Sequence, residues 1–284
     1  MLLRVVVFFG VVAVVVASAE ELPAAIAGAS SEETAVTVGA RTVVMRVLSP
    51  ADGRIDADPA VVITFATDRV TSLTRRPYSL TAEHFLENGH RAVSIDLPMH
   101  GERVGEYGSQ IEGFRNAFVA GVDPFAMLVE DGKAVIDALV RSGVAKPGRI
   151  VVAGTSRGGY MALRLFAADK RIAACAGYAP VTDWRVLREF AADKERSDVA
   201  DVALKKFVAE MAGRPMYVAI GKTDERVGTR ECEEFIEALR TSAANDAKTS
   251  PVQFQLTDDA GHSLNEQFYE AGRQFLLQQV VRTK

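Results

Sequence analysis

Beyond residue 60 the sequence alternates between short apolar runs and longer segments with helical periodicity. Six of the apolar runs are predicted to be strands: Val61–Phe65, Arg91–Ile95, Ile150–Ala153, Ile172–Tyr178, Met216–Ile220 and Pro251–Leu256. Runs of this kind are typical of strands that are buried on both faces. Helices between successive strands favour parallel pairing, because a parallel pair needs a long crossover connection. The alternation therefore predicts an α/β fold, a mostly parallel sheet covered by helices on both faces.

The segments between these strands supply the covering helices. Helical periodicity is strongest over Pro124–Ser142, where apolar residues recur near one face and Gly143 ends the pattern. Other helices are predicted over Leu80–Asn88, Tyr160–Ala168, Glu231–Leu239 and Leu264–Val281. The stretch Val186–Ala212 is also helical in pattern. It is either a small cap over a site or an ordinary crossover helix with an extension. The pattern does not distinguish the two, because both present the same apolar stripe.

The region before residue 60 has a different pattern. Two runs rich in β-branched residues, Thr34–Val38 and Arg41–Leu48, flank Gly39-Ala40. They predict an antiparallel pair of strands at a sheet edge. We expect Leu22–Ser31, which is rich in small residues, to be a loose terminus, and Ser49–Pro59 to be a turn.

Two stretches lack a regular pattern. Thr67–Arg76 is polar and is predicted to be a loop. Glu102–Val122 is punctuated by glycines and contains a helical piece around Ile111–Ala120. Because it is too long for a plain connector, and long loops in compact domains are often functional, we expect it to lie near a site.

The composition is that of a globular protein with a sizeable core. Of the 284 residues, 48% are hydrophobic and 25% are charged. The sequence has no internal repeat and no convincing linker, so residues 20–284 are predicted to form one domain. The formal net charge of −4 comes without the basic stripe that nucleic-acid binding requires, and we expect no nucleic-acid partner.

The first residues have the layout of a secretory signal peptide. Met1–Arg4 supplies a positive charge, Val5–Val16 is an apolar run, and Ala17-Ser18-Ala19 matches a cleavage site. The alternative is an uncleaved membrane anchor, but the run is shorter than the ~20 residues that span a bilayer. We therefore predict a signal peptide over residues 1–19, a secreted or periplasmic protein, and no stable membrane association after cleavage. N-terminal sequencing of the exported protein tests this prediction.

Cys175 and Cys232 are the only two cysteines. Export would permit a disulfide between them. However, Cys175 lies in a predicted strand and Cys232 in a predicted helix, so the sequence favours two packed free thiols. No Cys/His cluster has the spacing of a zinc site, and we expect neither a metal nor a cofactor.

The strand beginning at Ile150 leads into Gly154-Thr155-Ser156-Arg157-Gly158, which fits the G-x-S-x-G nucleophile elbow. In such an elbow the serine occupies a strained turn between a strand and a helix. A Cβ atom at either glycine would crowd the close approach of the two backbones. The predicted strand before the motif and the predicted helix after it give the pattern the context that it requires.

A serine hydroxyl needs a base to take its proton, and the base needs an acid to orient it. Both should follow Ser156 on loops at the carboxyl ends of strands. His262 is the only histidine after Ser156, and is therefore the predicted base. Asp224 follows the next-to-last strand and is the predicted acid, with Asp183 as its main competitor. Asp258 and Asp259 are too close to His262 in sequence to be comfortable partners.

Acyl transfer also needs two N–H donors that stabilise the developing oxyanion. One is predicted to be the backbone N–H of Arg157, directly after the nucleophile. The other should come from the loop after Val61–Phe65, at Ala66 or Thr67, and Thr67 is our preferred residue.

These motifs resemble those of the α/β-hydrolases related to prolyl oligopeptidases and dienelactone hydrolases. The resemblance rests on the elbow continued to Ala162, on Ala179-Pro180-Val181-Thr182-Asp183-Trp184, on Asp96-Leu97-Pro98-Met99-His100-Gly101, and on Asp224 and His262. It spans roughly residues 60–280 and implies an α/β-hydrolase fold with a Ser, Asp, His order of catalytic residues. The sequence lacks the N-terminal β-propeller of the peptidase branch, and its nucleophile is serine instead of the cysteine of dienelactone hydrolases.

Other residues are candidates for contact with a substrate. His100 and the Glu102–Val122 loop are predicted to line the pocket. Trp184 is either a pocket wall or part of the core. The side chain of Arg157 would attract an anionic substrate, although its backbone N–H is needed whatever the side chain is.

The primary functional hypothesis is an exported serine hydrolase that acts on small-molecule carboxylic esters through Ser156, His262 and Asp224. One alternative is a serine peptidase that acts on short peptides. Another is a hydrolase-fold protein that binds a ligand without catalysis.

Overall fold

A computed structural model describes residues 26, 28–51, 53–246, 251–263 and 265–281 of the chain. The predicted signal peptide at residues 1–19 lies outside them. None of the described helices is both long and apolar enough to cross a membrane.

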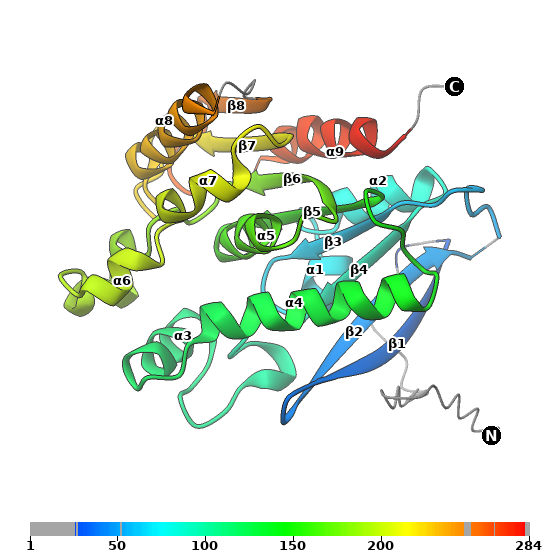
Figure 1. The fold of residues 1–284 in the computed structure, drawn as a ribbon, viewed down its shortest axis with the longest axis horizontal. Helices are drawn as coiled ribbons and strands as arrows, with labels where there is room; N and C mark the ends of the chain where they lie inside the picture. Colours follow the sequence, from blue (N-terminus) through cyan, green and yellow to red (C-terminus); the bar gives the residue numbers. More distant parts are fainter. Residues whose placement is uncertain (1–25, 27, 52, 247–250, 264, 282–284) are drawn as a thin grey trace.

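The centre of the molecule is one eight-stranded sheet with the strand order β1-β2-β4-β3-β5-β6-β7-β8 (Figure 1). The six predicted apolar strands pair in parallel. They are β3 (Val61–Phe65), β4 (Arg91–Ile95), β5 (Ile150–Thr155), β6 (Ile172–Tyr178), β7 (Met216–Gly221) and β8 (Val252–Thr257). Every residue of β3, β5 and β7 is buried, as their apolar sequences require in a sheet with two covered faces. The predicted α/β class is confirmed.

An antiparallel pair forms one edge of the sheet, as predicted. β1 (Ala29–Val38) pairs with β2 (Arg41–Pro50), and β2 pairs with β4 in antiparallel fashion. The expected loose terminus is wrong at residues 29–31, because the β1–β2 ladder continues to Ala29 opposite Pro50. The same ladder takes up Ser49 and Pro50, which were expected to lie in a turn.

Helices cover both faces of the sheet (Figure 1). α2 (Leu80–Glu87) and α9 (Glu266–Val280) contact each other and lie on one face. α4 (Pro124–Arg141), α5 (Arg157–Ala168) and α8 (Thr229–Asn245) cover the other. This arrangement, together with the strand order, is the α/β-hydrolase fold.

The segment between β6 and β7 is not one long helix, as its pattern predicted. It is a chain of short turns and helices: η2 (Trp184–Val186), η3 (Arg188–Asp193), α6 (Ser197–Asp201), η4 (Leu204–Phe207) and α7 (Val208–Met211). Leu187, Phe190 and Leu204 are fully buried, so these short pieces are held by tertiary packing. The segment is therefore not a plain crossover helix, and none of its residues is among those that line the pocket described below.

The predicted polar loop at residues 67–76 contains a short helix, α1 (Arg69–Thr74). Asp68 caps this helix, because its carboxylate accepts a hydrogen bond from the backbone N–H of Thr71 at 2.8 Å. Arg69 is 5% exposed and ion-pairs with Asp96 at the end of β4 (2.7 Å) and with Glu33 of β1 (2.9 Å). Although burial alone would lower the pKa of Arg69, its acidic partners raise it. This cluster ties the loop after β3 to the neighbouring strands.

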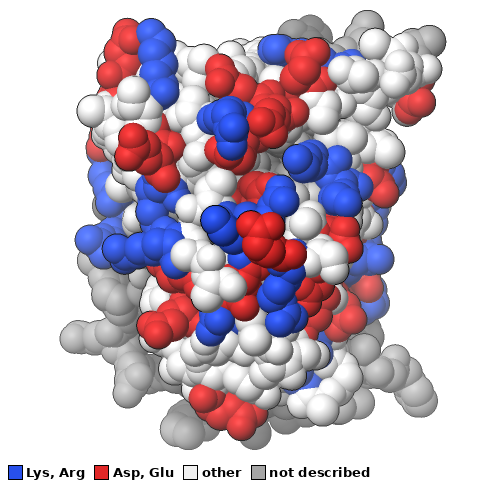
Figure 2. Space-filling view, turned by 90° about the vertical axis from the view of Figure 1, so that its left-hand side faces the viewer, with Lys and Arg blue, Asp and Glu red and all other residues white. Residues whose placement is uncertain are grey.

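The face that carries α3 (Gln110–Val119) and α6 shows basic and acidic side chains interspersed (Figure 2). No extended basic surface is visible on this face. Cys175 and Cys232 are buried free thiols, as predicted, and burial raises the pKa of each.

Candidate active site

Ser156 lies between the end of β5 and the start of α5 with φ 56° and ψ −120°, a backbone conformation that is costly for a residue with a Cβ atom. A Cβ atom on Gly154 would lie 2.1 Å from the carbonyl oxygen of Gly158. A Cβ atom on Gly158 would lie 2.1 Å from the carbonyl oxygen of Phe65 at the end of β3. Both glycines are therefore required by backbone contacts, as the elbow motif predicts.

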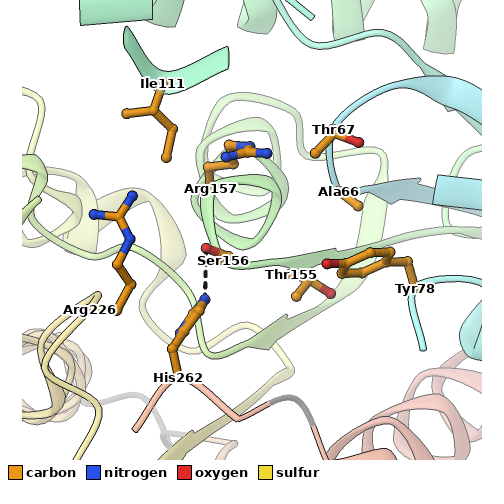
Figure 3. A pocket seen from close by; sticks show the side chains of 9 residues that line it. All are labelled: Ala66, Thr67, Tyr78, Ile111, Thr155, Ser156, Arg157, Arg226 and His262. Atoms are coloured by element: carbon orange, nitrogen blue, oxygen red, sulfur yellow. Dashed lines mark hydrogen bonds between the residues drawn. The ribbon is translucent and has the colours of Figure 1, made fainter. Parts of the chain in front are cut away.

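The imidazole of His262 joins Ser156 to Asp224 (Figure 3 shows the bond to Ser156). His262 Nε2 lies 3.1 Å from Ser156 Oγ, and His262 Nδ1 lies 2.7 Å from Asp224 Oδ2. A carboxylate only accepts hydrogen bonds, so Nδ1 carries the proton and Nε2 is left to accept from the serine hydroxyl. This is the tautomer that a general base for Ser156 needs.

Asp224 is held in place by its own loop. It is 2% exposed, and its Oδ1 accepts hydrogen bonds from the backbone N–H groups of Arg226 (3.0 Å) and Val227 (3.2 Å). Thr229 Oγ1 accepts from the N–H of Asp224 and donates to the carbonyl of Gly221 at the end of β7. Oδ2 is left facing His262.

The loop that carries His262 packs closely on the end of β7. A Cβ atom on Gly221 would lie 2.8 Å from the carbonyl oxygen of Asp259. Gly261 has φ 62°, and its N–H donates to Thr223 Oγ1 at 3.3 Å. This close approach brings His262 beside Asp224, and a side chain at position 221 would obstruct it.

The competing acids are committed elsewhere. Asp183 caps η2 by accepting from the N–H of Arg185, and it also accepts from Arg185 Nε at 2.9 Å. Burial would raise the pKa of Asp183, but these hydrogen bonds lower it overall. Asp258 pairs with Lys222, and Asp259 accepts from Asn265. Of these acids only Asp224 contacts His262, so the structure brings together the three residues that the sequence predicted.

The two residues predicted to supply the oxyanion hole both lie at the pocket beside Ser156. Thr67 and Arg157 both line it, and neither N–H has a hydrogen-bond partner within the described part of the chain. The N–H of Ala66 donates to Ser72 Oγ at 3.0 Å, so Ala66 is unavailable. Of the two residues that the sequence left open, Thr67 is thus the one with a free donor, as an oxyanion hole requires.

The pocket around Ser156 has a volume of about 200 Å³. Its wall, drawn in Figure 3, is formed by Ala66, Thr67, Tyr78, Ile111, Thr155, Ser156, Arg157, Arg226 and His262. Ile111 lies at the start of α3, within the Glu102–Val122 stretch that was expected near the site.

Neither of the two further candidates for substrate contact lines the pocket: the expectation for His100 is wrong, and for Trp184 the structure selects the core alternative. His100 is 1% exposed, does not line the pocket, and its Nδ1 donates to the carbonyl of Pro98 at 2.8 Å. Trp184 is fully buried in the core, where its ring stacks on Phe114 with centroids 5.1 Å apart. Motif position and residue type suggested a site for both side chains, whereas tertiary packing directs them inward.

Tyr78 and Arg226 were not predicted as pocket residues. The hydroxyl end of Tyr78 points toward the space beside Ser156 (Figure 3). Arg226 follows Asp224 by two positions, and that proximity is the only signal that the sequence holds for it. Tyr78 has no local signal, since long-range packing places the start of α2 at the site.

Replacing Gly154 with alanine should destabilise the fold by about 3 kcal/mol or more, because the new Cβ atom would collide with the backbone of α5. Urea unfolding followed by circular dichroism measures the loss. Gly105→Ala is the matched control, since a Cβ atom on Gly105 meets nothing within 4 Å. Equal stability of the two variants would contradict the close approach described for the elbow.

A model of the prolyl oligopeptidase family matches residues 126–279 of the chain. The match includes the elbow and the loops that carry Asp224 and His262. No curated protein matches the sequence at a significant level.

Several solved structures share the fold. A cold-adapted esterase from an Arctic intertidal metagenomic library superposes with a TM-score of 0.65 at 20% identity, covering 89% of this chain and 95% of that one. An acetyl xylan esterase from Paenibacillus sp. R4 gives 0.67 at 15% identity, with 95% and 88% covered. Prolyl oligopeptidase B from Galerina marginata gives 0.67 at 14% identity, and the match covers 89% of this chain but only 37% of that longer one. At such identities the likeness is one of fold.

Proposed function

The chain belongs to the prolyl oligopeptidase family of serine hydrolases, and we propose that it hydrolyses small carboxylic esters through a Ser156–His262–Asp224 triad. The observation that carries the proposal is the continuous hydrogen-bonded path from Ser156 Oγ through His262 to Asp224. A serine, a base and an acid in this geometry form the arrangement used for acyl transfer. Family membership favours an enzyme over a binding protein without catalysis.

The proposed reaction has two halves. Ser156 Oγ attacks the acyl carbon while His262 Nε2 takes its proton, and the oxyanion accepts from the N–H groups of Thr67 and Arg157. The imidazolium then gives its proton to the leaving alcohol, which departs and leaves an acyl-serine. Water, deprotonated by His262, attacks the acyl carbon, and Ser156 leaves with its proton restored. The products are an acid and an alcohol.

Two observations favour an ester over a peptide. The pocket of about 200 Å³ is smaller than the roughly 300–1,000 Å³ typical of drug-sized ligand sites, which suits a short acyl or alcohol group. Its wall contains two arginines and no carboxylate, so the free α-amino group of a short peptide would be repelled. Two of the structural relatives are esterases by name, which agrees with this choice.

The test measures kcat/KM of the purified protein for p-nitrophenyl acetate and butyrate, and compares these values with kcat/KM for aminoacyl p-nitroanilides. We expect ester turnover with kcat/KM at least 100-fold above that for the amides, and labelling of Ser156 by a fluorophosphonate probe. A preference for the amides would instead support the short-peptide peptidase. Failure of folded protein to react with any serine-directed probe would overturn the proposed mechanism.

We also propose that the enzyme is exported and loses residues 1–19. The basic start, the apolar run and the Ala17-Ser18-Ala19 sequence support this proposal. A mature protein beginning at Glu20 is the expected result of N-terminal sequencing.

A further inference from the structure

Arg157 presents a positive charge to the pocket without a carboxylate partner among the described residues. Its Nη2 donates to the amide oxygen Oε1 of Gln110 at 2.7 Å, the one hydrogen bond that its side chain makes to the described residues. Its Nε is buried and has no partner in the described chain. Burial lowers the pKa of Arg157, as expected for a cation whose lost hydration is incompletely replaced.

The other arginine of the pocket is neutralised. Arg226 forms a two-pronged ion pair with Glu189 of η3, with nitrogen–oxygen distances of 2.8 and 2.7 Å. Asp68 also acts on Arg157 electrostatically, but its carboxylate caps α1 and accepts from Thr67 Oγ1. The described residues that line the pocket include no carboxylate. The charge that remains at its wall is therefore positive and belongs to Arg157.

The position of Arg157 makes this cation unfavourable for the protein alone. It is the first residue of α5, and the positive end of a helix dipole disfavours a cation. Gln110, its hydrogen-bond partner among the described side chains, has φ 59° at the start of α3. A glutamine in that conformation is strained, and strain of this kind concentrates at functional sites. A bound anion would offset both costs.

We propose, on the basis of the function proposed above, that Arg157 binds a carboxylate of the substrate and makes the enzyme selective for anionic esters. Guanidinium groups recognise carboxylates through paired N–H donors, and within the described part of the chain only Nη2 of Arg157 makes a side-chain hydrogen bond, to a neutral amide. In Figure 3 the Arg157 side chain extends from the turn that carries Ser156. The carboxylate would thus lie near the scissile bond, on the acyl group or on the leaving group.

Two matched substrate pairs distinguish the two positions. Ethyl butyrate and monoethyl succinate differ by a charge on the acyl group. Phenyl acetate and 4-acetoxybenzoate differ by a charge on the leaving group. With the wild-type enzyme and pH-stat titration, we expect the anionic member of one pair to have the higher kcat/KM, and added NaCl to reduce the difference.

The variant Arg157→Gln keeps the backbone N–H and removes the charge. We expect it to lower kcat/KM about 10- to 100-fold for the preferred anionic ester, mainly through KM, because charged hydrogen bonds are lost. The loss of kcat/KM on the neutral member of the pair should be at least severalfold smaller than the loss on the anionic member. Arg157→Lys should restore part of the preference.

Arg164→Gln is the matched control. Arg164 lies on the same helix with its guanidinium carbon 3.3 Å from the centroid of the Phe207 ring, and it does not line the pocket. This variant should leave both substrate pairs unchanged.

Three results would overturn the inference. The first is that the wild type has no preference for an anionic ester. The second is that Arg157→Gln loses kcat/KM equally on the neutral and the anionic ester. The third is that this variant keeps full activity on the anionic ester. These results differ from failure of the esterase proposal, in which no ester of either pair is hydrolysed. Even in that case, the carboxylate site can be tested by calorimetric titration of the Ser156→Ala protein with monoethyl succinate. We expect the Kd to be at least tenfold weaker for the double variant that also carries Arg157→Gln.

Discussion

Replacing Ser156 with alanine should lower kcat for p-nitrophenyl esters by about 10⁶-fold, the scale of loss on removing the nucleophile from serine hydrolases. The hydroxyl has one side-chain partner, His262, so removing it deletes the attacking atom and little else. The melting temperature should stay within about 2 °C of the wild type. Stopped assays at high enzyme concentration and differential scanning calorimetry measure the two quantities.

Ser197→Ala is the control for this change. Ser197 is the exposed first residue of α6 and does not line the pocket. It should retain wild-type kcat and fluorophosphonate labelling, whereas Ser156→Ala should lose both. Full activity of Ser156→Ala would remove the basis of the proposed mechanism.

Replacing Asp224 with asparagine should reduce kcat by about 10⁴-fold with little effect on KM. The amide would no longer hold the proton of His262 on Nδ1, and it could not stabilise the imidazolium that forms as Ser156 attacks. Steady-state kinetics with a short ester measures the loss. Since the backbone N–H bonds to Oδ1 can be kept by an amide oxygen, circular dichroism should show a folded protein.

Asp183→Asn is the matched control, because Asp183 also follows a strand and is also buried. Its partner is Arg185 instead of His262, so the change should cost stability of about 1 kcal/mol and alter kcat less than threefold. A larger loss of kcat in Asp183→Asn than in Asp224→Asn would reverse the assignment of the acid.

Export, ester selectivity and the carboxylate site can be tested independently. The Ser156 and Asp224 variants report on the reaction itself, whichever ester is used. The Arg157 variants report on the choice of substrate, since they leave the backbone donor and the path from Ser156 to Asp224 unchanged. An enzyme that hydrolyses neutral esters, with no role for the Arg157 side chain, would support the proposed esterase activity and exclude the proposed carboxylate site.

The fold class, the elbow and the order Ser156, Asp224, His262 could be predicted from the amino-acid sequence. These features depend on local chemistry. Apolar runs long enough for buried strands alternate with helical patterns, and the elbow needs its two glycines because a Cβ atom at either position would collide with the neighbouring backbone. The same local rules placed the centres of the strands well but misjudged the broken segment between β6 and β7, whose short helices depend on buried contacts.

Which polar groups have hydrogen-bond partners, and which have none among the described residues, depends on the three-dimensional packing of the chain. In the folded protein Asp183 pairs with Arg185, and Asp224 pairs with His262. The backbone N–H of Ala66 donates a hydrogen bond to Ser72, whereas that of Thr67 has no partner in the described part of the chain. Tertiary packing buries His100 and Trp184 outside the pocket. It leaves the guanidinium of Arg157 without a carboxylate partner among the described residues. Each of these outcomes depends on contacts between residues far apart in the chain. The physical reason is that hydrogen bonds and ion pairs are settled by distances of a few ångströms, which local sequence patterns do not encode.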